Sequence, residues 1–122
     1  MRQVVLAGEL PELRAGDAGS ARTAYAGFLE RWPGNINAAV GLANAHHALG
    51  ELPQAEAVLR QAERRDPSSV IVLNNLAQTL SDQGRDEEAL PFIERALAAG
   101  GPFASAVRET RELIRGRLAK RN

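Results

Sequence analysis

The stretch LANAHHALGELPQAEAVLRQAERRDP, residues 42–67, contains the pattern that decides the fold. Thirty-four residues after its start, the chain reads LAQTLSDQGRDEEALPFIERAL, residues 76–97. The two segments share a Leu-Ala pair at their start, a glycine eight residues later and two alanines beyond it. A fixed period of this length indicates a repeat architecture, in which each unit is one supersecondary element stacked on the next.

The same register extends toward the start of the chain. Small residues and prolines recur at intervals of 34, as in Gly16, Gly50 and Gly84; Ala21, Ala55 and Ala89; and Pro33 and Pro67. A conservative pair, Leu59 and Ile93, keeps this interval too. Shared positions of this number in one register are not expected from chance, so we interpret the chain as a tandem repeat.

Each unit is predicted to form two short amphipathic helices joined by a tight turn. In the third unit, Leu73, Leu76 and Leu80 recur at helical spacing, and Gly84 ends the run as a C-terminal glycine does. Alanine, leucine, arginine and glutamate, which favour helix, dominate the composition. We therefore predict an all-α protein with helices at about 2–14, 18–31, 36–49, 53–65, 69–83, 86–99 and 103–119.

Composition excludes several classes of function. The 15 basic and 15 acidic residues cancel, so no overall field attracts the chain to nucleic acid. No cysteine is present, which excludes disulfides and thiolate sites. The start of the chain is not typical of a signal peptide, and no segment approaches the length of a membrane helix. We expect no membrane insertion and, by default, a cytoplasmic protein.

The 34-residue pattern resembles that of the tetratricopeptide repeat (TPR) family, with a leucine and a small residue in helix A, a glycine at the turn, alanines in helix B and a final proline. The resemblance implies a right-handed superhelical solenoid of antiparallel helix pairs in a single domain, 1–122. Its parts would be a degenerate repeat at about 2–33, repeats at 36–67 and 70–101, and a capping helix at 103–119. The sequence departs from the family where Ala39 and Leu73 replace a large aromatic residue, and His46 and Leu80 replace a tyrosine. In the first unit, Pro11 interrupts helix A.

The last segment, FASAVRETRELIRGRLAKRN, residues 103–122, does not match helix B. It is predicted to cap the solenoid, which needs a polar outer face at its end. Its apolar residues, Phe103, Val107, Ile114 and Leu118, are expected to face the third unit. Its arginines, Arg108, Arg111, Arg115 and Arg117, are expected to face water.

In the TPR family the A helices line a concave groove that binds an extended peptide or a partner helix. Carried over by register, the groove positions are Asn37, Val40, Asn44 and His47 in the second unit, and Ile71, Asn74, Asn75, Gln78 and Ser81 in the third. Amide side chains both donate and accept, so they suit the backbone of an extended ligand. The plainer interpretation is that these polar groups face water and that Asn75 braces neighbouring helices.

The adjacent histidines, His46 and His47, raise the question of a metal site. Adjacent helical positions diverge by about 100°, so one ion does not easily take both rings. By register His46 falls on the packed face and His47 on the groove. We therefore expect replacement of His47 to alter partner binding with little loss of stability, and replacement of His46 to do the reverse.

No catalytic motif is present. The serines lie mostly at turns or helix starts, where capping explains them, and no phosphate loop or dinucleotide motif occurs. We predict a protein that is not an enzyme, with no metal, cofactor, small-molecule substrate or nucleic-acid partner. The groove lacks the inner basic residues with which some family members clamp a terminal carboxylate.

The main hypothesis is a protein-interaction module that binds a peptide or partner protein in the groove. One alternative is a non-catalytic accessory domain of a larger bacterial enzyme or envelope assembly, because residues 74–89 and 96–110 are similar to repeats at the C-terminal end of some bacterial C39-type peptidase-like proteins. Another is a homo-oligomer, because the apolar residues of VVLAGEL (4–10) and FLERW (28–32) have no preceding repeat to cover them.

Overall fold

The computed structural model of the protein describes residues 17–121, which form six α-helices. They are α1 (Ala18–Arg31), α2 (Ile36–Ala48), α3 (Leu52–Arg65), α4 (Val70–Asp82), α5 (Asp86–Ala99) and α6 (Ala104–Arg121). Within this range the predicted helices are confirmed, and their ends lie within two residues of the expected positions. The predicted helix at 2–14 lies outside the described residues, as do Pro11 and the VVLAGEL segment.

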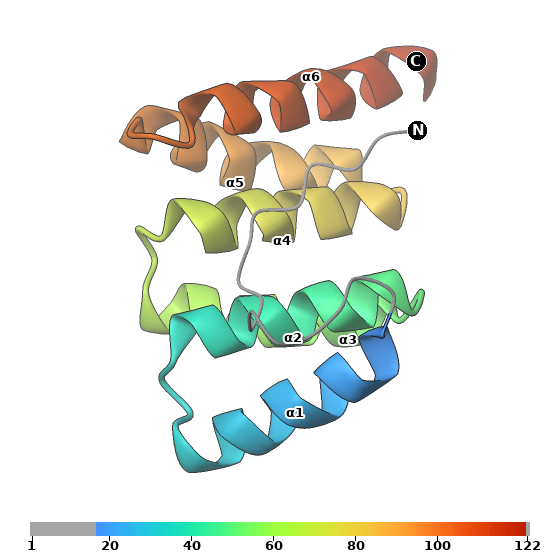
Figure 1. Cartoon of the computed structure of the whole chain (residues 1–122). Helices are drawn as coiled ribbons and strands as arrows, with labels where there is room; N and C mark the ends of the chain where they lie inside the picture. Colours follow the sequence, from blue (N-terminus) through green and yellow to red (C-terminus); the bar gives the residue numbers. More distant parts are fainter. Residues whose placement is uncertain (1–16, 122) are drawn as a thin grey trace.

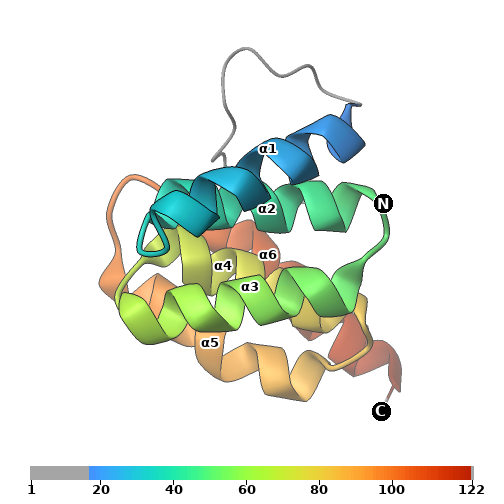
Figure 2. The same cartoon turned by 90° about the horizontal axis from the view of Figure 1, so that it is seen from below.

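The helices form an all-α solenoid of antiparallel pairs (Figures 1 and 2). Helices α2 and α3 make one pair and α4 and α5 the next, with α1 packed on α2 at one end. Helix α6 packs against both α5 and α4 at the other end. It therefore occupies the place that the first helix of a further pair would take.

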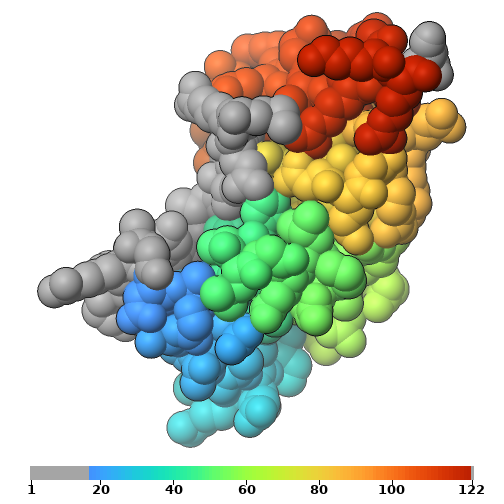
Figure 3. Space-filling model, turned by 90° about the vertical axis from the view of Figure 1, so that its right-hand side faces the viewer, coloured from blue at the N-terminus to red at the C-terminus, as the bar shows by residue number. Residues whose placement is uncertain are grey.

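Both predicted turn glycines adopt the left-handed conformation that glycine favours, with φ of 76° at Gly50 and 84° at Gly84. The amide of Gly50 donates to the carbonyl of His47 at 3.0 Å, and that of Glu51 to His46 at 2.8 Å. The second turn repeats both bonds one period later. This double bond pattern is the Schellman motif, which satisfies carbonyls that the helix end leaves open. Figure 3 shows the two turns, green and yellow, on one side of the molecule with the C-terminal end of α6 above them in red.

Helix starts are capped in the same register. The Asn35 side chain accepts from the amide of Ala38 at 2.8 Å, and Ser69, 34 residues later, accepts from Val72 at 3.4 Å. Such caps satisfy amides that have no partner inside the helix. Pro91 lies inside α5, where the helix continues through it.

One core runs through the stack from α2 to α6. The small residues predicted to let the helices approach closely are all buried, as are the leucines and isoleucines between them: Ala43, Ala55, Ala62, Ala77, Ala89, Ala96, Leu59, Leu73, Leu76, Leu80, Ile93 and Ile114. A smaller cluster joins α1 to α2 through Tyr25, Ala38 and Leu42. The Tyr25 ring packs on Gly41, where an added Cβ would lie 2.4 Å from ring atoms. Glycine at position 41 thus allows α1 to dock closely on α2.

Candidate functional site

The predicted groove residues lie on α2 and α4, the first helices of the two pairs. Four come from α2, namely Asn37, Val40, Asn44 and His47, and five come from α4, namely Ile71, Asn74, Asn75, Gln78 and Ser81. The two helices pack side by side, and the Asn75 amide nitrogen contacts the Asn44 carbonyl oxygen at 3.4 Å. The 34-residue register thus brings these positions together on neighbouring helices, as expected.

Their exposure differs from that of an open polar surface. Asn37 is exposed, while Asn44, His47 and Ile71 are half-buried. The other five, Val40, Asn74, Asn75, Gln78 and Ser81, are buried. Val40 belongs to the core between the helices, because its apolar side chain turns inward between α2 and α4. The residues within reach of a partner are therefore fewer than the register alone predicts.

A row of amides crosses from α4 to α2. Asn74 is fully buried and donates its side-chain amide to the Asn75 oxygen at 3.3 Å, and Asn75 donates in turn to Asn44. The hydroxyl of Thr79 donates to the backbone carbonyl of Asn75 at 2.8 Å. Asn75 therefore braces neighbouring helices, which is the structural role considered for it above. The amides of this row are held in fixed directions, because each is part of a hydrogen-bonded chain.

His47 joins α2 to α4. Its Nε2 lies 2.7 Å from an Asp82 carboxylate oxygen, and the His47 side chain is 9% exposed. On the other Asp82 oxygen, Arg117 of α6 donates at 2.8 Å, and the same guanidinium nitrogen contacts the Ser81 hydroxyl. Burial opposes the charged form of Asp82, yet the hydrogen bonds from His47 and Arg117 outweigh it and hold the pKa of Asp82 below its ordinary value. This cluster ties the two repeats and the last helix together.

The His47 contact changes one expectation. The sequence predicts that His47 contributes to partner binding with little effect on stability. Because its ring links two repeats through a largely buried hydrogen bond, we now expect its loss to destabilise the fold as well.

His46 serves the neighbouring junction. Its Nδ1 lies 2.8 Å from Glu51, the residue that precedes α3, and Arg22 of α1 binds the other Glu51 oxygen at 2.8 Å. The contact with His46 and that with Arg22 both lower the pKa of Glu51, while burial opposes this shift. His46 is half-buried and holds the α2–α3 turn, a scaffold role like the one predicted.

The two histidines therefore contact different carboxylates on different elements. Among residues 17–121, no group of three or more histidine, aspartate or glutamate side chains is placed to hold a metal ion.

Helix α6 is more engaged than the sequence predicts. Arg108 and Arg115 are exposed as expected, but Arg117 is mostly buried against Asp82, and Arg111 pairs with Glu94 at 3.0 Å. Long arginine side chains can reach a neighbouring helix from a position at the edge of the packed face, so spacing alone does not place them in water. Val107 and Ile114 are buried against the third unit, and Leu118 packs on the core. Phe103 instead is 36% exposed, because it precedes the helix and lies in its turn.

The repeat pattern matches a family model described as tetratricopeptide repeat over residues 12–74, slightly more than half of the chain. A second model with this description matches residues 49–105. The chain belongs to the tetratricopeptide repeat family. A search of curated proteins gives no match. The likeness to C39-type peptidase-like proteins is not supported, since both matches concern the repeat alone.

TPR repeats are generally protein-interaction modules, and TPR domains are typically non-catalytic. None of the helices within residues 17–121 is long and apolar enough to cross a bilayer.

The sequence analysis missed Asp82 and Arg117, which lie at the centre of the junction between α2, α4 and α6. Asp82 stands one residue after Ser81, at the end of α4, and no feature of its own distinguishes it. It also missed the ion pairs between α3 and α5. There the register does provide a signal, because Arg22 and Glu51 lie 34 residues before Glu56 and Arg85, and both pairs are bonded with their charges exchanged.

Proposed function

We propose that this TPR domain binds an extended segment of a partner protein along the face of α2 and α4. The residues that contact the segment are Asn37, Asn44 and Ile71, which are exposed or half-buried on that face. The buried amides of Asn75 and Gln78 hold the direction and spacing of this surface. A groove that is already formed spends little ordering entropy when it binds.

The observation that supports the proposal is the hydrogen-bonded contact between Asn44 and Asn75, residues of equivalent helices in successive repeats. Amides that project from a rigid helical surface can pair with the N–H and C=O groups of an extended backbone, whatever its side chains. The half-buried Ile71 beside them offers apolar contact to a side chain of the partner. The combination suits a segment recognised by its backbone together with one apolar residue.

Quantitative affinity capture from cell extract tests the proposal. The wild-type domain is compared with the variant N37A/N44A/I71A and with a control, Gln54→Ala, which changes an exposed residue of α3 away from the groove. Circular dichroism at 222 nm confirms that all three are folded. We expect a set of proteins retained by the wild type and by the control and lost with the triple variant.

Equal capture by the triple variant and the wild type, with all proteins folded, would show that the α2–α4 face is not the binding surface.

A further inference from the structure

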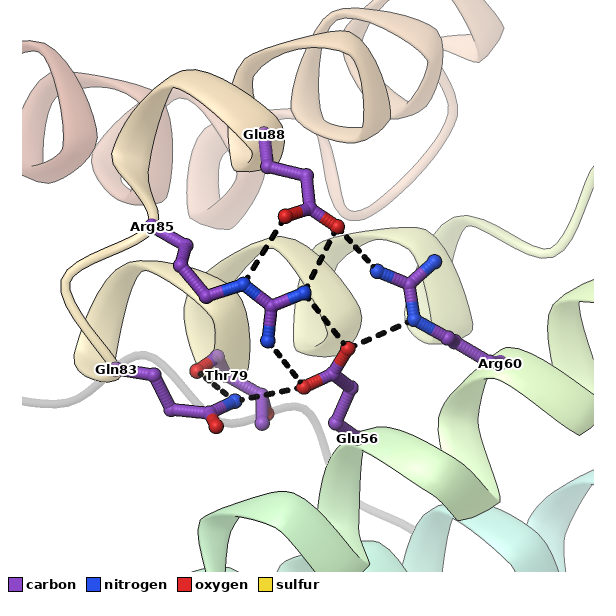
Figure 4. A network of polar contacts seen from close by, with 6 residues as sticks. All are labelled: Glu56, Arg60, Thr79, Gln83, Arg85 and Glu88. Carbon is purple, nitrogen blue, oxygen red and sulfur yellow. Dashed lines mark hydrogen bonds and ion pairs between the residues drawn. The ribbon is translucent and has the colours of Figure 1, made fainter.

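Successive junctions between the second helices of the repeats are built differently. Between α3 and α5, three ion pairs span the gap: Glu56 with Arg85, Arg60 with Glu88 and Glu63 with Arg95. Arg60 and Arg95 also lie over the ring of Phe92, at 5.8 and 5.7 Å from its centre. Figure 4 shows Glu56 bound by both Arg60 and Arg85, with Glu88 on the other side of the two guanidinium groups. Long charged side chains thus fill this junction.

The equivalent junction between α1 and α3 lacks most of this filling. Register equivalents one repeat earlier retain a single ion pair, Arg22 with Glu51 at 2.8 Å. The other positions are occupied by uncharged residues that cannot form the corresponding pairs: Ala26 and Gln54 replace Arg60 and Glu88, Leu29 and Gln61 replace Glu63 and Arg95, and Val58 replaces Phe92. The space is therefore open, and its walls are largely apolar.

A pocket of about 250 Å³ occupies this place. We name it the α1–α3 pocket; its walls are Leu29, Pro33, Asn35, Ile36, Ala39, Leu42, Val58, Gln61, Ala62 and Arg65. Seven of these ten residues are apolar. Pockets for drug-sized ligands are usually larger than this, at about 300–1,000 Å³. The volume and lining suit one large apolar side chain of a protein segment better than a whole small molecule.

The polar edge of the pocket is basic. Arg65 lines it and is exposed, and Arg31 and Arg64 are exposed at the C-terminal ends of α1 and α3. These two ends lie on the same side of the molecule (Figures 1 and 2). Within residues 17–121 none of the three arginines forms an ion pair, although Arg31 lies over the exposed ring of Trp32 at 4.9 Å. Their acidic neighbours in the chain are Glu30 and Asp66, which leaves one excess positive charge.

We propose that the α1–α3 pocket is a second docking surface, which binds a partner segment that presents a large apolar side chain flanked by acidic residues. The apolar side chain enters between Leu29, Ile36 and Val58, and an acidic side chain beside it pairs with Arg65. The pocket shares no residue with the proposed groove on α2 and α4, so this inference does not depend on that proposal.

The test titrates ¹⁵N-labelled domain with synthetic peptides and follows amide chemical shifts. The first peptide has a Leu-Phe pair flanked on each side by two glutamates. Its controls have lysines in place of the glutamates, or alanines in place of the Leu-Phe pair. We expect saturable shifts at Ile36, Val58 and Gln61 with the first peptide and none with the two controls.

Charge reversal at the rim locates the acidic contact. Arg65→Glu should weaken binding of the glutamate peptide by about fivefold, because an attraction becomes a repulsion at a partly exposed site. Arg64→Glu, an exposed neighbour that does not line the pocket, is the matched control and should change the affinity by less than about twofold.

The inference is overturned if the glutamate peptide produces no saturable shift at the pocket residues, or if Arg64→Glu and Arg65→Glu weaken it equally. It is also overturned if light scattering at the concentration used for NMR shows a dimer whose pocket amides are perturbed on dilution. In that case the occupant is a second copy of the chain.

Discussion

Glu56 is the centre of the ion-pair network between α3 and α5, and its replacement by glutamine gives the most specific test of the packing between repeats. The carboxylate accepts from Arg60 at 2.8 Å, from Arg85 at 2.7 and 3.1 Å, and from the Gln83 amide at 3.0 Å. Glutamine keeps the size of the side chain but removes the charge that all these donors share. Glu56→Gln should therefore weaken the junction without opening a cavity.

The expected magnitude follows from the ionisation of Glu56. Burial raises its pKa, but the hydrogen bonds from Arg85, Arg60 and Gln83 outweigh burial and lower the pKa from 4.5 to about 2. At 1.36 kcal/mol for each pKa unit, the upper limit of this contribution is about 3 kcal/mol. Arg60 and Arg85 are 32% and 40% exposed, so water screens the pairs, and we expect a loss of about 1–2 kcal/mol at pH 7.

The sign of the pH dependence is fixed by the lowered pKa. The folded protein holds Glu56 ionised more strongly than the unfolded chain does, so its contribution is complete above pH 4.5 and is lost as the pH falls toward 2. The difference in the free energy of unfolding between wild type and Glu56→Gln should therefore decrease on acidification. At pH 3 it should be less than half of its value at pH 7.

Urea unfolding followed by circular dichroism at 222 nm, at pH 7, 5, 4 and 3, measures this difference directly. Glu112→Gln is the matched control, because Glu112 is exposed on α6 and forms no ion pair within residues 17–121. A Glu56→Gln difference that is absent at pH 7, or that is the same at pH 3 as at pH 7, would refute the reasoning.

Three further substitutions test other parts of the fold. Gly41→Ala places a Cβ against the Tyr25 ring, so it should cost about 1–3 kcal/mol and weaken hydrogen-exchange protection most in α1. His47→Ala should cost about 1 kcal/mol in urea unfolding, because it removes the hydrogen bond between α2 and Asp82; a stability unchanged from that of the wild type would restore the purely binding role predicted from the register. Ile93→Ala removes a fully buried side chain at the centre of the core and should cost about 2–5 kcal/mol, whereas a loss below about 1 kcal/mol would show that the core there is loosely packed.

The repeat period is the reason that so much of the fold could be predicted. Glycine at positions 50 and 84, and alanine at positions such as 55 and 89, report backbone conformation and close helix approach, which depend on local geometry alone. These features repeat because each unit makes the same contacts with its neighbours. Helix ends and the buried face of each helix could therefore be read from the residues.

The side chains that cross between repeats could not be predicted in the same way. Arg117 reaches Asp82 over 35 residues of sequence, and helical periodicity places it only on a face, without indicating which carboxylate it meets. The burial of Gln78 and Ser81 similarly depends on what packs over α4, which the pattern within α4 does not encode. The register could have revealed the open α1–α3 pocket, because the charged residues Glu63 and Arg95 have uncharged equivalents in Leu29 and Gln61.

The central proposal, that a partner segment lies along α2 and α4, is tested most directly by site-specific photo-cross-linking. Benzoylphenylalanine is introduced at position 37 or 71 on the proposed surface, or at position 54 on the outer face of α3, and each protein is irradiated in cell extract. We predict cross-links to the same captured protein from positions 37 and 71 and none from position 54. Cross-links that form from position 54 while positions 37 and 71 give none would contradict the proposed function.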